Sequence, residues 1–127
     1  MPLLKLRESQ IMKIHYLTGI CAVFFVAIHI LFRIGMGMSF NESLEYHNVV
    51  ANYHNMYYVI LLELILVFIS IHGFNGLRII LLELKQNQWW ESTITILVLA
   101  AMIGVIAYGT RTIIIGSQFD ITLPDMF

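Results

Sequence analysis

Charged residues are scarce in this sequence, and neither sign of charge dominates. Only 12% of the 127 residues are charged, and the formal net charge is −1. Because there is no excess of positive charge, the composition gives no indication of binding to nucleic acid. The single cysteine, Cys21, cannot form an internal disulfide. Repeats, low-complexity tracts and domain linkers are also absent, which predicts one domain over residues 1–127.

Hydrophobic residues, by contrast, make up 59% of the chain, and the mean hydropathy is +0.81. A soluble domain of this length could not bury so much apolar surface. Residues 14–38, 57–82 and 93–115 form segments long enough to cross a ~30 Å hydrocarbon core, which takes about 20 helical residues. No small-residue cleavage site follows the first segment, so it is not a signal peptide. The sequence predicts an all-α integral membrane protein with three transmembrane helices in contact with lipid.

Basic residues are distributed unevenly around these spans, and the bias predicts an orientation. The basic residues expected at the inner ends are Lys5, Arg7, Lys13, Arg78 and Lys85. The loop after the first span carries Glu42 and Glu45 and no lysine or arginine. By the positive-inside rule, we expect a cytoplasmic N-terminus and an external C-terminus in the cell (inner) membrane.

Polar and ionisable side chains are dense within the spans, where each is a functional candidate by default. The first two spans contain His15, Thr18, His29, Arg33, Glu63, His72, Asn75 and Arg78. At 100° per residue, one face of the first helix carries His15, Thr18, Ala22, His29 and Arg33. One face of the second helix carries His54, Tyr58, Phe68, His72, Gly76 and Glu83. Each face therefore combines histidine with a small residue and a charged residue.

This combination of residues indicates haem binding. A small residue lets a flat macrocycle approach the helix backbone, and a neutral imidazole is a good axial ligand for haem iron. An arginine near the membrane surface, such as Arg33 or Arg78, can pair with haem propionates. The alternative is that the histidines only bond to backbone or to each other across the bundle.

The depths of the two central histidines constrain this hypothesis. His29 lies 16 residues beyond Lys13, or ~24 Å along the axis at ~1.5 Å per residue. His72 lies 11 residues before Glu83, or ~16 Å from the same end, and it is closer still to Arg78. The predicted difference in depth is about 8–15 Å, whereas two ligands of one iron lie only ~4 Å apart. Either there are two haems, each completed by a histidine of another chain, or one of these histidines is not a ligand.

A sequence motif in the second span adds a family resemblance. His72-Gly73-Phe74-Asn75-Gly76-Leu77-Arg78 followed by Glu83 has the form H-x-x-x-G-[IL]-R-x-x-x-x-[DE]. It resembles the haem-ligand helix of the cytochrome b membrane-anchor subunits of succinate dehydrogenase, or succinate:quinone oxidoreductase. Residues 15–19, HYLTG, are similar to the H-R-x-[ST]-G opening of that family.

This resemblance implies a haem b ligated by His72 on the side that faces the soluble subunits, with His29 serving an outer haem. His15 and Gly76 belong to the matching motifs and are expected beside the cofactor. It also implies a flavoprotein subunit, an iron–sulfur subunit and a second membrane-anchor subunit as partners, with menaquinone or ubiquinone as electron acceptor. The chain itself would then have no active site for succinate, and it could serve succinate oxidation or fumarate reduction.

Three departures from the family pattern leave the quinone site open. The motif arginine is Tyr16 here, the serine three residues before the motif histidine is Met12, and a tyrosine after the acidic residue is replaced by Leu84. The site could be formed mainly by a second anchor subunit, and the candidate contacts from this chain are Thr18, Tyr16, Trp89 and Trp90. Interfacial anchoring is the alternative role for Tyr16 and the two tryptophans.

Glu63 lies roughly opposite His72 around the second helix and has two possible roles. It could be a protonated carboxyl bonded to a neighbouring helix, or it could transfer protons during quinone chemistry. On the third span, a strip of small residues (Ala100, Gly104 and Ala107) is expected to pack closely.

The sequence thus favours an electron-transfer subunit, and two alternatives remain. One is a small transporter or proton channel that uses His29, Glu63 and His72, and the other is a haem-free anchor.

Overall fold

The computed structural model of the chain describes residues 8–35, 37 and 39–118, and three long helices dominate it. The elements are α1 (Glu8–Gly35), α2 (Phe40–Ser43), α3 (Tyr46–Tyr53), α4 (Met56–Glu83) and α5 (Gln88–Ser117). The three long helices, α1, α4 and α5, contain 28, 28 and 30 residues, or roughly 42–45 Å each. All three are long and apolar enough to cross a membrane, and no strand occurs in the described residues. The prediction of an all-α membrane protein with three spans is confirmed.

Asparagine caps decide where α4 and α5 begin. The Asn55 side chain accepts a hydrogen bond from the Tyr57 backbone N–H at 3.0 Å, and Asn87 accepts one from Trp89 at 3.1 Å. Such caps satisfy backbone donors that have no partner within the helix. Because of the Asn87 cap, α5 begins before residue 93, and both tryptophans lie in its first turn. At the other boundary, α1 ends at Gly35, and Met38, the predicted end of the first span, lies outside the described residues.

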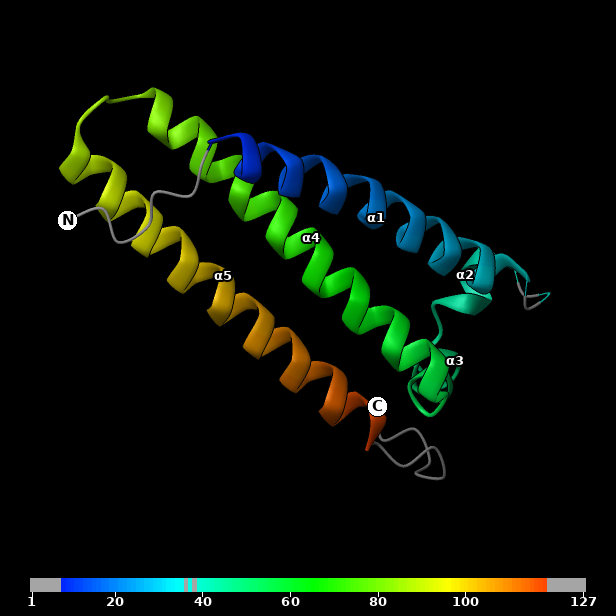
Figure 1. The fold of residues 1–127 in the computed structure, drawn as a ribbon. Helices are drawn as coiled ribbons and strands as arrows, with labels where there is room; N and C mark the ends of the chain where they lie inside the picture. Colours follow the sequence, from blue (N-terminus) through cyan, green and yellow to red (C-terminus); the bar gives the residue numbers. More distant parts are fainter. Residues whose placement is uncertain (1–7, 36, 38, 119–127) are drawn as a thin grey trace.

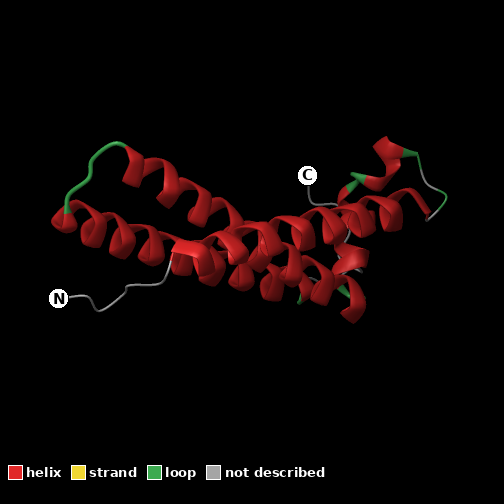
Figure 2. Cartoon of the chain, turned by 45° about the horizontal axis from the view of Figure 1, so that its top comes forward, coloured by secondary structure: helices red, strands yellow, loops and turns green. Residues whose placement is uncertain are grey.

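The long helices form a single layer with α4 in the middle (Figure 1). α4 packs against both α1 and α5, whereas the described residues of α1 and α5 do not contact each other. The start of α1 and the α4–α5 connection lie at one end, and α2 and α3 lie at the other (Figure 1). Lys13 and Lys85 are at the first end, and Glu42 and Glu45 are at the second. Lys5 and Arg7 fall outside the described residues. Figure 2 shows continuous helix between the two ends, with loops confined to them.

The short helices close the end of the layer that carries Glu42 and Glu45. An arginine of α1, Arg33, donates a hydrogen bond to the Ser43 carbonyl and so ties α1 to α2. Ser39 caps α2, and its backbone N–H donates to the Glu42 carboxylate at 2.8 Å. The backbone and side-chain hydrogen bonds from Ser39 lower the pKa of Glu42. These bonds define the path of the chain between α1 and α3.

Aromatic rings fill much of the contact between α1 and α4. Phe25 and Phe68 stack with ring centroids 5.4 Å apart, and Phe32 lies 5.5 Å from Tyr58. Tyr58 is only 5% exposed. The predicted face of α4 therefore points toward α1 at Tyr58 and Phe68, whereas His54 is exposed and precedes the helix.

The contact between α4 and α5 differs from the predicted packing of α5. Ala100, Gly104 and Ala107 are exposed, and a Cβ on Gly104 would meet nothing within 4 Å. The close approach is instead at Gly109, where a Cβ would lie 2.6 Å from Leu66 Cδ2. The predicted strip does not form the contact with α4, because Thr95 and Thr110 bond side chains of α4 and thereby fix the rotation of α5.

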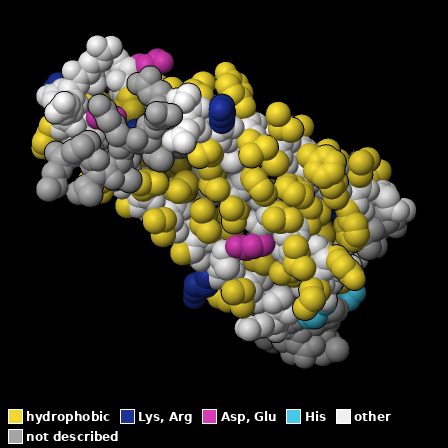
Figure 3. Space-filling model, in the orientation of Figure 1, with side chains coloured by type: hydrophobic (Ala, Val, Ile, Leu, Met, Phe, Trp, Pro, Cys, Tyr) yellow, Lys and Arg dark blue, Asp and Glu magenta, His cyan; other side chains and the backbone are white. Residues whose placement is uncertain are grey.

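Most of the span surface is uncovered. In the most apolar windows, 11% of α1, 11% of α4 and 17% of α5 are buried. No large side chain among the described residues is fully buried. Figure 3 shows one face as a broad hydrophobic surface interrupted by few charged groups. Such a surface requires lipid or protein around it.

Candidate functional site

His15 of α1 and His72 of α4 form the centre of the candidate site. Their imidazole rings stack with centroids 4.1 Å apart and planes inclined by 13°. The Nδ1 atom of His72 lies 2.9 Å from the backbone carbonyl oxygen of His15. Because a carbonyl can only accept, Nδ1 carries the hydrogen, and in a neutral ring Nε2 keeps its lone pair. Within the described residues, that Nε2 atom has no hydrogen-bond partner.

Two glycines allow the rings to lie this close to the opposite helix. A Cβ on Gly19 of α1 would lie 2.8 Å from Cε1 of His72. A Cβ on Gly76 of α4 would lie 3.2 Å from Cε1 of His15. Each imidazole therefore rests on a glycine of the other helix, and Gly76, predicted beside the cofactor, contacts His15 in the structure.

Thr18 and Tyr16, predicted near a quinone, lie in different environments. Thr18 is 5% exposed, and its hydroxyl donates to the Ile14 carbonyl at 2.7 Å, within its own helix. Tyr16 is 64% exposed, with its ring edge-on to His15 at a centroid distance of 6.1 Å.

The two predicted tryptophan contacts lie apart from these residues, at the start of α5. Trp89 is exposed, and the Trp90 indole N–H donates to the Leu81 carbonyl at 2.9 Å. The structure does not bring Thr18, Tyr16, Trp89 and Trp90 together into one pocket.

His29 lies at the other end of the α1–α4 contact, between the helices. Its ring centroid is 5.5 Å from that of Tyr58, and its Nδ1 atom is buried with no hydrogen-bond partner in the described part of the chain. Arg33, one turn further along α1, donates to the Ser43 carbonyl. His29 therefore has an arginine nearby, as predicted, but no carbonyl that orients its ring.

The separation of His29 and His72 is larger than the sequence suggested. Tyr58, which contacts His29, precedes His72 by fourteen residues, and His15, which contacts His72, precedes His29 by fourteen. At ~1.5 Å per residue, both counts place the two histidines about 21 Å apart along the helix axes.

The expected 8–15 Å treated Lys13 and Glu83 as level with each other. In the structure, the Asn75 side chain donates to the Ile11 carbonyl at 3.2 Å. The last turns of α4 therefore extend beyond the level of Ile11, so Glu83 lies closer than Lys13 to the end of the molecule that carries the α4–α5 connection.

The Arg78 side chain points toward α5, away from the face of α4 that carries His72. Its Nε donates to the Thr95 hydroxyl at 2.9 Å, and its Nη2 lies 3.9 Å from a carboxylate oxygen of Glu91. The Glu91 side chain is 57% exposed, so this long ion pair is weak.

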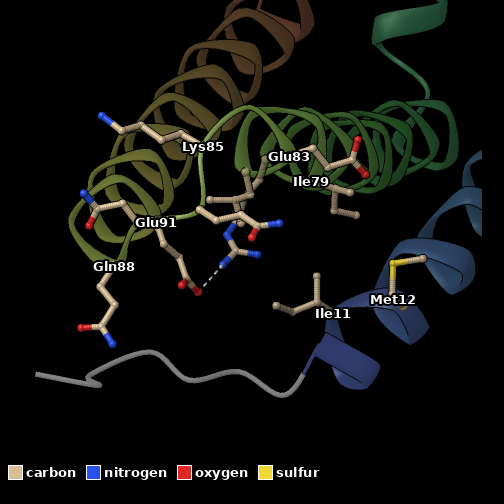
Figure 4. Close-up of a pocket in the computed structure, with 11 residues that line it drawn as sticks. Ile11, Met12, Ile79, Glu83, Lys85, Gln88 and Glu91 are labelled. Carbon is tan, nitrogen blue, oxygen red and sulfur yellow. Dashed lines mark ion pairs between the residues drawn. The ribbon is translucent and has the colours of Figure 1, made fainter.

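Arg78 also lines a cavity of about 570 Å³ at the end of the helices that carries the α4–α5 connection. The apolar lining includes Ile11 and Met12 from α1 and Ile79 from α4. Figure 4 shows these side chains around the cavity, with the ion pair to Glu91 dashed and Lys85 pointing away. The lining thus combines apolar side chains with charged and amide groups, Arg78 among them.

Glu63 lies in the contact between α4 and α5. The Thr110 hydroxyl donates to its Oε1 atom at 2.5 Å. Since His72 and Tyr58 contact α1, the carboxyl is on the other side of α4 from the histidines.

No three or more histidine, cysteine, aspartate or glutamate side chains gather to hold a metal ion within residues 8–35, 37 and 39–118. A haem iron needs fewer protein ligands than a free metal ion, because the porphyrin supplies four ligands and the chain need supply only an axial one.

Gly19 is the site residue whose role sequence reasoning missed. It was visible as the last residue of the HYLTG motif. Its contact is with His72, which is distant in sequence, so the motif alone could not show what the glycine accommodates.

Comparison with known families gives one match. The chain matches the family described as succinate dehydrogenase/fumarate reductase transmembrane subunit over residues 8–117, which includes all three long helices. No curated protein matches the chain.

Proposed function

This chain belongs to the succinate dehydrogenase/fumarate reductase transmembrane subunit family, as its motifs predicted, and we propose that it binds haem b through His72. In this proposal it helps to pass electrons from the iron–sulfur subunit to a quinone. Its partners are that subunit, the flavoprotein subunit and a second membrane anchor, and the succinate site lies outside this chain. The charge bias supports a cytoplasmic N-terminus in the cell membrane.

The observation that carries the haem proposal is the hydrogen bond from His72 Nδ1 to the His15 carbonyl. Histidines that ligate metals usually donate their other ring N–H to a carbonyl or carboxylate, which fixes the ring and its tautomer. His72 meets this requirement, and its Nε2 lone pair is left for iron. The bound haem would supply reversible one-electron transfer.

The stacked rings determine where this chain can offer that ligand. At a centroid distance of 4.1 Å, no macrocycle fits between His15 and His72. A haem held by His72 would therefore lie outside the α1–α4 contact, and a further protein ligand would be supplied by another chain. This requirement supports a second membrane-anchor subunit as the partner.

We extend the proposal to His29 as the ligand of a second, outer haem. Its distance from His72 forbids a shared iron, and Arg33 lies one turn away as a possible partner for a propionate. Its orphan Nδ1 atom makes His29 less well oriented than His72.

The cavity beside Arg78 is the best candidate for the quinone head group. Its volume of about 570 Å³ lies in the ~300–1,000 Å³ range of ligand pockets, and its lining combines apolar side chains with several polar groups. The weak Glu91 pair leaves Arg78 N–H groups able to donate to a quinone carbonyl. This location differs from the contacts with Tyr16, Trp89 and Trp90 that the sequence offered, and interfacial anchoring is left as the role of those residues.

An optical spectrum of the purified membrane complex tests the proposed function directly. We expect a sharp α-band in the dithionite-reduced minus oxidised spectrum, as six-coordinate haem with histidine ligands gives. A complex with all its subunits and no such band would establish a haem-free anchor.

The proton-relay alternative finds less support in the geometry. Glu63 bonds Thr110 on the α5 side of α4, whereas His29 and His72 lie on the α1 side, so the three groups do not form a continuous chain.

We expect Glu63→Gln to retain haem and quinone turnover within about twofold, because the amide oxygen can still accept from Thr110. Glu63→Leu removes the acceptor and should lower thermal stability, since a buried hydroxyl without a partner costs about 1–3 kcal/mol. The measurements are haem content, quinone reduction and melting temperature. If Glu63→Gln lost quinone turnover but kept succinate oxidation with an artificial acceptor, a proton-transfer role would replace the structural one.

A further inference from the structure

The inner histidines and glycines form a reciprocal arrangement of two H-x-x-x-G segments. His15 and Gly19 occupy α1, and His72 and Gly76 occupy α4. The two helices run antiparallel, so each histidine meets the glycine of the other segment (Figure 1). Because glycine has no Cβ, each ring can lie directly against the opposite backbone.

One hydrogen bond makes this arrangement asymmetric. His72 Nδ1 donates to the His15 carbonyl, whereas the Nδ1 atom of His15 is buried without a partner among the described residues. Only His72 therefore has both its ring position and its tautomer fixed.

We infer that Gly19 and the backbone carbonyl of His15 are the positioning elements that make His72, and not His15, the haem ligand. This inference rests on the proposed haem-binding function and assigns roles to two residues that do not touch the iron. The His15 imidazole itself serves as a packing surface for the His72 ring.

Gly19 acts through the donor atom of His72. A Cβ at this position would lie 2.8 Å from Cε1 and 3.0 Å from Nδ1 of that ring. The ring has little freedom to move away, because His15 is stacked on it at 4.1 Å. An added methyl group would displace the ring and break the bond that fixes the tautomer.

Gly76 differs, because the ring it contacts makes no ring-nitrogen hydrogen bond in the described structure. A Cβ there would lie 3.2 Å from Cε1 of His15 and within 4 Å of no other side chain in the described residues. A small shift of His15 would accommodate it while the His15 carbonyl stayed in place. The two glycines are therefore expected to tolerate alanine very differently.

The chain offers two matched controls. Gly73 is next to His72 in sequence, and a Cβ there would meet nothing within 4 Å. Gly109 lies in the α4–α5 contact, where a Cβ would meet Leu66 at 2.6 Å, far from the histidines. Gly73→Ala controls for the loss of a helical glycine, and Gly109→Ala controls for a packing clash in general.

The test is the ratio of haem to flavoprotein in the assembled complex, with the low-spin haem signal in electron paramagnetic resonance. We expect Gly73→Ala and Gly109→Ala to match the wild type, and Gly76→Ala to keep more low-spin haem than Gly19→Ala. Gly19→Ala should lose more than half of the haem, and the remainder should become partly high-spin. His15→Ala, which keeps the carbonyl, should retain low-spin haem with a shifted midpoint potential.

The outcomes separate this inference from the proposed function. A wild-type complex without haem refutes the proposed function itself. A haem-loaded wild type with a normal Gly19→Ala variant refutes only the positioning role. Failure of Gly19→Ala to assemble also refutes it, because positioning requires haem loss from an assembled complex. Complete haem loss in His15→Ala would show that the imidazole acts directly on the cofactor.

Discussion

Replacing His72 with alanine is expected to remove one haem completely, and replacing His29 is expected to remove a different one. The two side chains lie about 21 Å apart along the helix axes, so they cannot serve the same iron. His72→Ala should abolish the inner haem and leave the outer haem poorly reduced by succinate, because the nearer electron relay is lost. His29→Ala should abolish the outer haem and leave the inner one reducible.

Haem stoichiometry and redox titration of both variants beside the wild type measure this result. His54→Ala is the matched control, because His54 is exposed outside the long helices. Under the proposed ligation, each variant would leave a histidine of the partner chain without its iron in a low-dielectric site, so the yield of assembled complex should also fall. A wild type with one haem, or loss of the same spectral component in both variants, would refute the two-haem proposal.

The first two spans show what helical periodicity can predict. Counting at 100° per residue grouped Thr18 and Ala22 with the histidines of α1, and the structure buries both of them. This works because a helix fixes the angular positions of its own residues whatever surrounds it.

Contacts between helices were harder to predict, because they depend on the register of segments distant in sequence. The contact of Gly19 with His72, and that of Arg78 with Thr95, each require the relative height and rotation of two helices. The strip of small residues on α5 did not identify its contact with α4, because a residue such as Gly104 can face lipid as easily as a helix. In the structure Glu63 pairs with Thr110 at that contact, since each group needs a partner in an apolar environment.

Expression of this chain alone is expected to give no stable haem protein, whereas the tagged chain from native membranes should copurify with at least one further membrane chain. The long helices form one layer, and α1 and α5 do not contact each other in the described residues. At most 17% of any span's most apolar window is buried. A single layer of helices would supply only one ligand, His72 Nε2, to the iron of a haem beside it. Six-coordinate iron would therefore need its other protein ligand from a second chain.

The measurement is size-exclusion chromatography and haem absorbance of the chain expressed alone and expressed with its partner subunits. We expect aggregation or degradation of the lone chain, with any bound haem five-coordinate and high-spin. Coexpression should give a monodisperse complex with low-spin haem. In that complex, His72→Ala should remove the low-spin signal of the inner haem, and the subunits should stay associated. This comparison separates the need for a partner in folding from the need for a partner in ligation. A monodisperse monomer with six-coordinate iron would contradict the prediction, because both axial ligands would then come from this chain.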